Sequence, residues 1–207
     1  MNSRQEDIEL DTRSQIVEAA HTRFSHYGYG KTTMAEIATD TGMSAANLYR
    51  YFESKQDIIA ECANRCMCER VDRLRAAIRK PGISAVEQLQ TYVLTDLNIS
   101  HEMAEDDEKI SELVNNITLQ RPDMVYRKIE AENALIAEIL SYGNETGEFA
   151  IDDITNTAST IHMSLVVFNV PTFMSLYSLE EFKEKATSII NLIVTGLAKP
   201  NQASSPT

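Results

Sequence analysis

The sequence predicts an all-α protein in two parts, a three-helix N-terminal domain with a helix-turn-helix and a larger helical domain, with about nine helices in all. Apolar residues recur every three or four positions along nearly the whole chain, which is the spacing of one face of an α-helix. Only 7 glycines and 5 prolines interrupt the 207 residues, and 43% of the residues are hydrophobic. The chain is therefore long and apolar enough to bury a core without disulfides.

Local start and stop signals set the expected helix limits in the first part. Gly28 and Gly42 are placed to adopt the left-handed conformation that ends a helix. Thr33 is placed to cap the following helix, with Glu36 completing a capping box, and Ser44 caps the next. Residues 1–10 are expected to be flexible. The expected helices span about residues 11–27, 33–41, 44–51 and 54–80.

Longer helices are expected after Pro81 and Gly82, which end the helix before them. Pro122 suits the first turn of a helix, and Gly143 and Gly147 mark a turn. The stretch 154–179 has no charged side chain, but polar residues interrupt it throughout, so no membrane span is predicted. The later helices span about residues 84–103, 107–120, 122–142, 151–170 and 179–197, and the polar tail 200–207 is expected to be flexible.

The last two expected helices carry apolar seams that indicate a homodimer. Residues spaced three and four apart form the seams: Ile151, Ile154, Ala158, Ile161, Leu165 and Phe168 on one helix, and Phe182, Ala186, Ile189, Ile193 and Leu197 on the other. The first helix carries further apolar residues on its other faces, so the pair has more apolar surface than one neighbour can cover. An intersubunit four-helix bundle is therefore predicted.

The overall charge limits what the protein can bind. Against 19 basic residues stand 31 acidic ones, and the net charge of −12 argues against non-specific binding to nucleic acid or membranes. Residues 13–55, however, hold five basic and four acidic side chains, so any DNA contact must be local to this segment. The first seven residues lack the apolar core of a secretory signal, and a cytoplasmic protein is expected.

Two short helices joined at Gly42 and Met43 have the spacing of a helix-turn-helix, whose second helix enters the major groove of DNA. Ile37, Ala38 and Leu48, together with Met43, are the expected inward residues. An ordinary helical hairpin would show the same pattern. The alternative from another class is a helical enzyme or small-molecule carrier without specific DNA binding.

Other chemistry is not indicated. Cys62 and Cys66 lie one helical turn apart and could together ligate a metal or sense oxidants, whereas Cys68 falls elsewhere on the helix. No CxxC pair or nearby histidine completes a site, so reduced thiols acting as small apolar residues are the simpler interpretation. No nucleophile elbow, zinc-protease motif or glycine-rich phosphate loop is present. Neither catalysis nor a cofactor is predicted.

A longer string around the helix-turn-helix carries a family resemblance. The segments FSHYGYGKTTMAEIA (residues 24–38) and GMSAANLYRYFESK (residues 42–55) closely resemble the DNA-binding domain of the TetR (tetracycline-repressor-like) family. The likeness covers roughly residues 11–60, and the rest matches the family only in helix number and lengths. It implies a DNA-binding domain at 11–53, a ligand-binding and dimerisation domain at 54–199, and a regulator, most often a repressor, that leaves a palindromic operator when a small molecule binds.

The resemblance also assigns DNA contacts by position. Residues that fall where the family contacts phosphate are Thr32, Thr33, Tyr51 and Lys55, and those that fall where it reads bases are Ala45, Ala46, Asn47 and Tyr49, next to the capping Ser44. The chemistry agrees, since Asn can bond adenine at N6 and N7 and Ala or Tyr can contact thymine methyls. Arg50 could reach phosphate or guanine. Tyr49 and Tyr51 could instead pack beneath Phe52.

An effector pocket is expected in the larger domain. Aromatic and methionine side chains with a few polar groups make adaptable cavities. The candidates are Tyr92, Met103, Met124, Tyr126, His162, Met163, Val166, Phe168, Phe173 and Met174, each of which could equally be plain core. Few basic side chains lie nearby, so a neutral or cationic hydrophobic effector is favoured over a polyanion. Release and promotion of DNA binding both remain open at this point.

Overall fold

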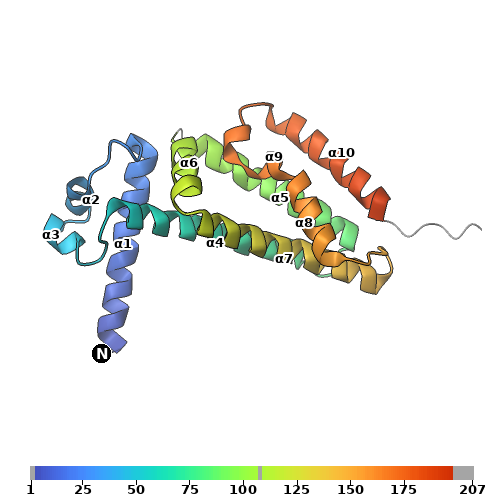
Figure 1. Cartoon of the computed structure of the whole chain (residues 1–207), viewed down its shortest axis with the longest axis horizontal. Coiled ribbons are helices and arrows are strands. Elements are labelled where there is room, and N and C mark those ends of the chain that lie inside the picture. Colours follow the sequence, from blue (N-terminus) through green and yellow to red (C-terminus); the bar gives the residue numbers. More distant parts are fainter. Residues whose placement is uncertain (1–2, 107–108, 198–207) are drawn as a thin grey trace, which may run out of the picture. The chain divides into compact units, whose positions relative to one another are not determined.

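Helices account for most of the chain that the computed structural model describes, which is residues 3–106 and 109–197 (Figure 1). No β-strand occurs within these ranges, and the prediction of an all-α fold is confirmed. Nor does any helix there combine the length and apolar character that a bilayer crossing requires. The elements are α1 (Ser3–Tyr27), α2 (Met34–Asp40), α3 (Ala45–Leu48), α4 (Lys55–Ile78), α5 (Ala85–Asp106), α6 (Ile110–Gln120), α7 (Pro122–Thr146), α8 (Ile154–Ser164), α9 (Val166–Asn169), the 3-10 helix η1 (Pro171–Phe173) and α10 (Leu179–Leu197).

The chain divides into two compact units. Unit 1 comprises residues 1–69 and 103–127, and unit 2 comprises residues 70–102 and 128–207. The division falls inside α4, whereas the sequence predicts a domain boundary after residue 53. Unit 1 therefore joins α6 and the start of α7 to the three N-terminal helices.

The apolar stripe of α1 forms the centre of unit 1. Ile16, Ala20 and Phe24 of this stripe are almost completely buried. Their partners in the core are Val17, Ile37, Ala38, Leu48, Phe52, Ile58, Ile59, Cys62 and Ile117. Each large apolar side chain buried in this way contributes about 1.5–3 kcal/mol to folding. The core thus draws on α1, α2, α3, α4 and α6, and it holds the two shortest of these helices in place.

The capping signals of unit 1 act as predicted. Gly28 and Gly42 have positive φ values of 88° and 68°. The Thr33 hydroxyl accepts a hydrogen bond from the Glu36 amide at 3.3 Å, and the Glu36 carboxylate accepts one from the Thr33 amide at 2.8 Å. Ser44 caps α3 by accepting from the Asn47 amide at 3.2 Å.

Several helix limits differ from the expected ones. The first helix begins at Ser3, so residues 3–10 are helical and the expectation of a flexible N-terminus over them is wrong. The third ends at Leu48, and residues 49–51 form a turn instead of a further helical turn. The seventh continues through Gly143 to Thr146. Glycine is needed at 143 because a Cβ there would lie 2.1 Å from a ring carbon of Phe149.

The helix expected over residues 151–170 is broken into shorter pieces. Asp153 caps α8 by accepting a hydrogen bond from the Asn156 amide at 3.0 Å, so the helix begins at Ile154. Leu165 leaves the helical conformation, and Pro171, which has no N–H to donate, begins η1. The expected start of the sixth helix at residue 107 and the tail 200–207 lie outside the described residues.

Much of the two apolar seams is buried inside unit 2 itself. Ala158, Ile161, Leu165 and Phe168 are almost completely covered, as are Phe182 and Ala186 on α10. The Phe168 and Phe182 rings meet edge to face with their centroids 6.0 Å apart. The apolar side chains left exposed on these helices and the turns between them are Met163, Val166, Phe173, Leu176, Tyr177 and Leu192.

Candidate nucleic-acid interface

Helix α3 is anchored by one buried residue, and the predicted DNA contacts around it are exposed or half-buried. Leu48 is fully buried in the core of unit 1. Tyr49 is 52% exposed, and Ala46 and Arg50 are also exposed. Of the other predicted contacts, Ser44 and Thr33 are exposed, and Ala45, Asn47 and Tyr51 are half-buried. Of the predicted base-reading residues, Ala46 and Tyr49 are thus open to solvent, Asn47 is half-buried, and Ala45 packs against the core of unit 1.

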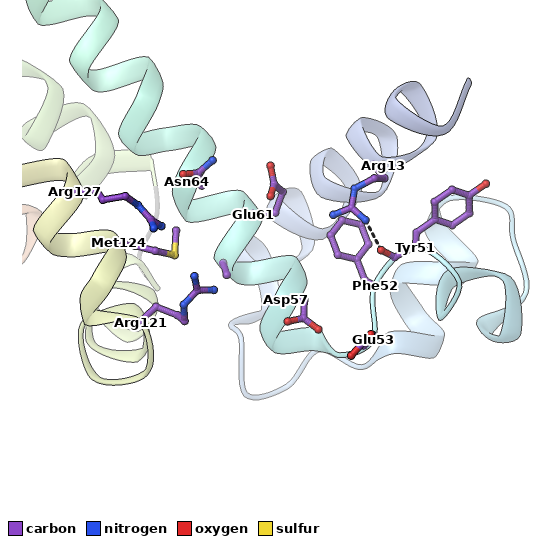
Figure 2. Close-up of a pocket in the computed structure, with 11 residues that line it drawn as sticks. Arg13, Tyr51, Phe52, Glu53, Asp57, Glu61, Asn64, Arg121, Met124 and Arg127 are labelled. Carbon is purple, nitrogen blue, oxygen red and sulfur yellow. Dashed lines mark hydrogen bonds between the residues drawn. The ribbon is translucent and has the colours of Figure 1, made fainter. Parts of the chain in front are cut away.

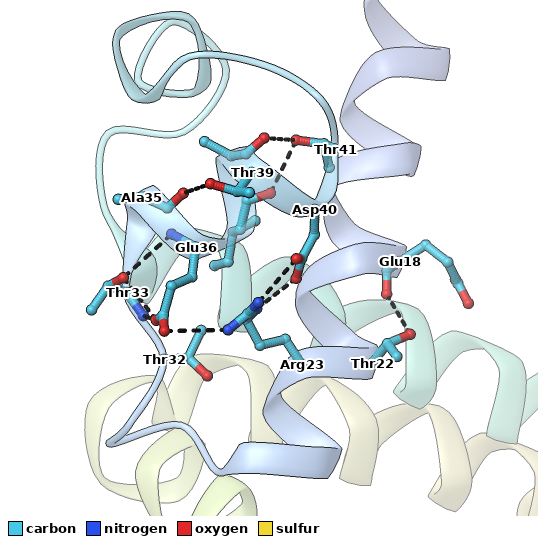
Figure 3. Close-up of polar contacts among 12 residues, drawn as sticks. Glu18, Thr22, Arg23, Thr32, Thr33, Ala35, Glu36, Thr39, Asp40 and Thr41 are labelled. Carbon is cyan, nitrogen blue, oxygen red and sulfur yellow. Dashed lines mark hydrogen bonds and ion pairs between the residues drawn. The ribbon is translucent and has the colours of Figure 1, made fainter.

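Arg23 of α1 orients α2, the first helix of the helix-turn-helix (Figure 3). Its guanidinium donates two hydrogen bonds to Asp40 at 2.5 and 2.9 Å, and it lies 3.4 Å from Glu36. The bond from Arg23 holds the pKa of the Asp40 carboxyl below its ordinary value. Hydrogen bonds from Thr33 lower the pKa of Glu36 in the same way. Both acids are therefore ionised at neutral pH, with a guanidinium beside them that offsets their charge.

Three of the predicted phosphate contacts have internal partners: Thr33 bonds Glu36 in the capping box, and Lys55 and Thr32 bond backbone carbonyls. The Lys55 ammonium donates to the carbonyls of Tyr29 and Thr32, both at 2.7 Å, and lies 4.1 Å from the centre of the Tyr29 ring. Burial lowers the pKa of Lys55. The Thr32 side chain is buried, and its hydroxyl donates to the Gly28 carbonyl at 3.0 Å. The side chains of Lys55 and Thr32 hold the loop that leads into α2, and contact with phosphate stays a prediction.

Helix α6 also holds this loop, and the sequence did not predict that contact. Glu112 accepts a hydrogen bond from the Gly30 amide at 2.9 Å, across 82 positions of sequence. Asn116 accepts one from Gln56 at 3.1 Å, and Gln56 in turn accepts one from the Tyr29 hydroxyl at 2.7 Å. Sequence signals exist at Gly28 and Gly30, where a Cβ would come within 3.1 and 3.2 Å of the Glu112 carboxylate. The partner of these glycines cannot be read from the sequence.

The predicted effector residues are divided between the two units. Met103, Met124 and Tyr126 belong to unit 1, and the other seven belong to unit 2. Tyr92, Met124, His162, Phe168 and Met174 are buried, and Met103 is half-buried. Those exposed to solvent are Tyr126, Met163, Val166 and Phe173. The set therefore does not form one enclosed group within either unit.

Unit 2 contains a buried charged cluster that the sequence did not reveal. Arg70 lies 2.6 Å from Asp96 and 3.3 Å from Glu132, and it donates a hydrogen bond to Ser100 at 2.8 Å. His162 lies 2.9 Å from Glu132. Lys128 approaches the same carboxylate at 2.8 Å. In the sequence Arg70 stands in a run of basic residues that suggests a solvated helix face, yet only 4% of it is exposed.

Burial and the neighbouring cations shift the pKa values of the acids in this cluster in opposite directions. Burial disfavours the ionised form of Glu132, but His162, Lys128 and Arg70 outweigh it and bring the pKa to about 2. Burial raises the pKa of Asp96 despite its ion pair with Arg70. The nearby Tyr92 hydroxyl is buried and has no hydrogen-bond partner among the described residues. Glu132 is thus the acid whose charge the surrounding cations stabilise most.

The three cysteines are free thiols. Cys62 is buried in the core of unit 1, donates to the Val17 carbonyl at 3.5 Å, and has its pKa raised by burial to about 12. Burial also raises the pKa of Cys66. Since the thiolate is the reactive and metal-binding form, Cys62 and Cys66 behave as small apolar residues at neutral pH.

A groove of about 440 Å³ lies on unit 1 (Figure 2). It runs along the first turns of α4, with Phe52 on one side and Met124 on the other. Of the predicted site residues it includes Tyr51 and Met124. The full lining is Arg13, Tyr51, Phe52, Glu53, Asp57, Ala60, Glu61, Asn64, Arg121, Met124 and Arg127.

Both parts of the chain match known protein families. Residues 16–62 match the family described as bacterial regulatory proteins, tetR family, and residues 85–190 match the tetracyclin repressor-like C-terminal domain. The HTH-type transcriptional regulator BetI of Agrobacterium fabrum is 37% identical over 71 residues, so the match spans about a third (34%) of each chain. The fatty acid metabolism regulator protein of Bacillus subtilis is 20% identical over 191 residues, which are 88% of this chain and 94% of that protein.

A solved structure shows the same fold. A transcriptional regulator from Cytophaga hutchinsonii superposes with a TM-score of 0.69 at 24% identity, over 89% of this chain and 97% of that one. The two family models together cover the helix-turn-helix and most of the helical remainder. The chain therefore belongs to the tetR family of bacterial regulatory proteins and is a DNA-binding transcriptional regulator, not an enzyme.

Proposed function

We propose that this regulator is a repressor that binds a palindromic operator as a homodimer and releases it when a small hydrophobic effector binds. The observation that supports it most directly is the exposure of Ala46, Tyr49 and Arg50 on and just after α3, a helix held by the Ser44 cap and the buried Leu48. A twofold dimer would present two such helices to half-sites about one helical turn or more apart, near 34–36 Å per turn.

Base reading is assigned to residues of α3 and to Tyr49, which directly follows it. Asn47 can bond adenine in the major groove, and Ala45, Ala46 and the Tyr49 ring can lie against thymine methyls. Lys31 and Arg50 are exposed and can approach the phosphates, as can the Thr33 hydroxyl. Because Lys55 already bonds two carbonyls, its contribution to binding is expected to come largely through the shape of the loop.

Asn47→Ala is expected to weaken binding to the cognate operator by about 1–3 kcal/mol and to relax preference at one position in each half-site, because it removes a base contact. The salt dependence should stay nearly the same. The measurement is a titration of an operator selected from a random duplex library, and of its scrambled version, at several salt concentrations.

The matched control for Asn47→Ala is Lys31→Ala, which removes an exposed charge. It should weaken binding on both duplexes alike and flatten the salt slope by about 1. If the Asn47 variant still distinguished the operator from the scrambled duplex fully, base reading would be assigned to Tyr49 and Arg50 instead. Equal binding of the unaltered protein to both duplexes would contradict the operator proposal itself.

The effector is proposed to bind in unit 2, beside the buried polar cluster. Tyr92 supports this, because a buried hydroxyl without a partner is available to a ligand's polar group. Unit 2 also buries apolar side chains from the predicted effector set, Phe168 and Met174 among them. A hydrophobic molecule carrying one hydrogen-bonding group is the class that fits.

A thermal-shift screen tests the effector proposal. An effector present at about 100 times its Kd should stabilise the folded protein by about 2.7 kcal/mol and raise its Tm by several degrees. The same compound should lower operator affinity in the duplex titration. The Tyr92→Phe variant, which loses only the hydroxyl, should keep the fold and show a smaller shift. A screen in which no apolar compound shifts the Tm would contradict the proposal.

A further inference from the structure

We propose that the groove on unit 1 is a second ligand site, which takes a small hydrophobic organic cation. Its volume of about 440 Å³ lies within the range of about 300–1,000 Å³ typical of small-molecule pockets. Phe52, Ala60 and Met124 form apolar parts of the lining and are themselves 6% exposed or less, so they are held rigidly by the core around them. The body of an apolar ligand would contact these three side chains.

Two of the three negative charges of the groove lack partners. Asp57 and Glu61 stand on the first turns of α4, and Glu53 lies two residues before that helix begins; all three are exposed. Asp57 accepts one hydrogen bond, from Ser54 at 2.7 Å. Glu53 and Glu61 have no hydrogen bond or ion pair with any residue that the structure describes. Two carboxylates are therefore available to a cation that lies over the apolar lining.

The positive charges of the groove, by contrast, are already engaged. Arg121 makes two hydrogen bonds to Asp123, both at 3.0 Å, and Arg127 lies 3.3 Å from the same carboxylate. Arg13 donates to the Tyr51 carbonyl, and its guanidinium lies 4.2 Å from the centre of the Phe52 ring. This stacked arginine shows that the groove already accommodates a cation against an aromatic face. An anionic ligand would have to compete with Asp123 and would meet the unpaired carboxylates.

The groove is separate from the proposed effector site. Every residue that lines it belongs to unit 1, whereas Tyr92 and the charged cluster belong to unit 2. It includes Tyr51, Phe52 and Glu53, which directly follow the turn after α3. A ligand that shifts these residues would change operator affinity, and operator binding would change the ligand's affinity by the same factor.

Titration calorimetry on the full-length protein without DNA tests the site, with tetraphenylphosphonium as the probe. Tetraphenylborate, which has the same shape and the opposite charge, is the control ligand. The cation should bind with one site per chain and at least about tenfold more tightly than the anion. The double variant Glu53→Gln/Glu61→Gln should weaken binding of the cation by about 3- to 20-fold, since each exposed charge pair contributes a factor of a few to the affinity.

Two further variants separate this site from others. Glu18→Gln/Glu69→Gln removes two exposed carboxylates of unit 1 that lie outside the groove, and it should leave the affinity within about twofold. Asn64→Trp adds bulk to the lining without a charge and should abolish binding. Circular dichroism melting establishes that each variant is folded. Equal binding of cation and anion, or unchanged cation binding by the groove variants, would overturn the proposal, and neither result depends on an operator.

Discussion

Arg70→Met is expected to lower the free energy of unfolding by about 3–5 kcal/mol. The Arg70 guanidinium lies 2.6 Å from the Asp96 carboxylate and also beside that of Glu132. Both carboxylates are buried. Methionine fills a similar volume but leaves Asp96 as a buried charge without its partner. Glu132 keeps Lys128 and His162, so the larger loss should arise at Asp96. Urea denaturation at pH 7 measures the change.

The control for Arg70→Met is the same substitution at Arg73, three residues along α4. Arg73 lies 2.8 Å from Glu102, and both side chains are about half exposed, so its removal should cost no more than about 1 kcal/mol. Adding Asp96→Asn to the Arg70 variant should restore part of the stability, because the unpaired charge is then gone. Similar losses for Arg70→Met and Arg73→Met would show that the buried cluster does not stabilise unit 2.

The pH chosen for these measurements follows from Glu132. Its pKa in the folded protein is about 2, below the 4.5 of an ordinary glutamate. A carboxyl group whose pKa is lower in the folded protein than in the unfolded chain stabilises the fold fully at pH values above its unfolded pKa. For Glu132 this stabilisation is lost as the pH falls from about 4.5 to about 2. Measurements at pH 7 therefore compare the variants with Glu132 fully ionised in both states.

Leu192→Glu is expected to dissociate the proposed homodimer. Leu192 is 74% exposed on α10, whereas Ile193 of the predicted seam is half-buried within its own unit. A carboxylate without a partner in an apolar interface costs several kcal/mol, and about 1.4 kcal/mol changes a dissociation constant tenfold. Analytical ultracentrifugation at micromolar concentration should show the unaltered protein at twice the chain mass and the variant at the 23.2 kDa of one chain.

Leu119→Glu provides the matched control for Leu192→Glu. Leu119 is also strongly exposed, at 77%, but it lies on α6 in unit 1. Its substitution should leave the dimer intact and should not change the helical content. A monomeric unaltered protein, or a Leu192 variant that remains dimeric, would contradict the assignment of the interface to the exposed residues of α8, α10 and the segment between them.

Helix type and many helix ends follow from interactions between close neighbours in the chain, and these were predictable. The capping box of Thr33 and Glu36 joins residues three apart, and Gly28 and Gly42 act through their own φ angles. The last helix has the limits expected of it, Leu179–Leu197. The helix-turn-helix could be located for the same reason, since its turn and caps all lie within about 20 residues of sequence.

Partners that are distant in sequence were decided by the tertiary structure alone. Arg70 belongs to a run of basic residues, and only folding brings it to Asp96 and Glu132, where ion pairs make its burial tolerable. Gly30 meets Glu112 across 82 positions, and the seams of α8 and α10 turn largely inward. Whether an apolar or charged side chain is covered depends on which helices pack against it. Periodicity identifies the face that a residue occupies, but the partner of that face is set by the packing of the whole chain.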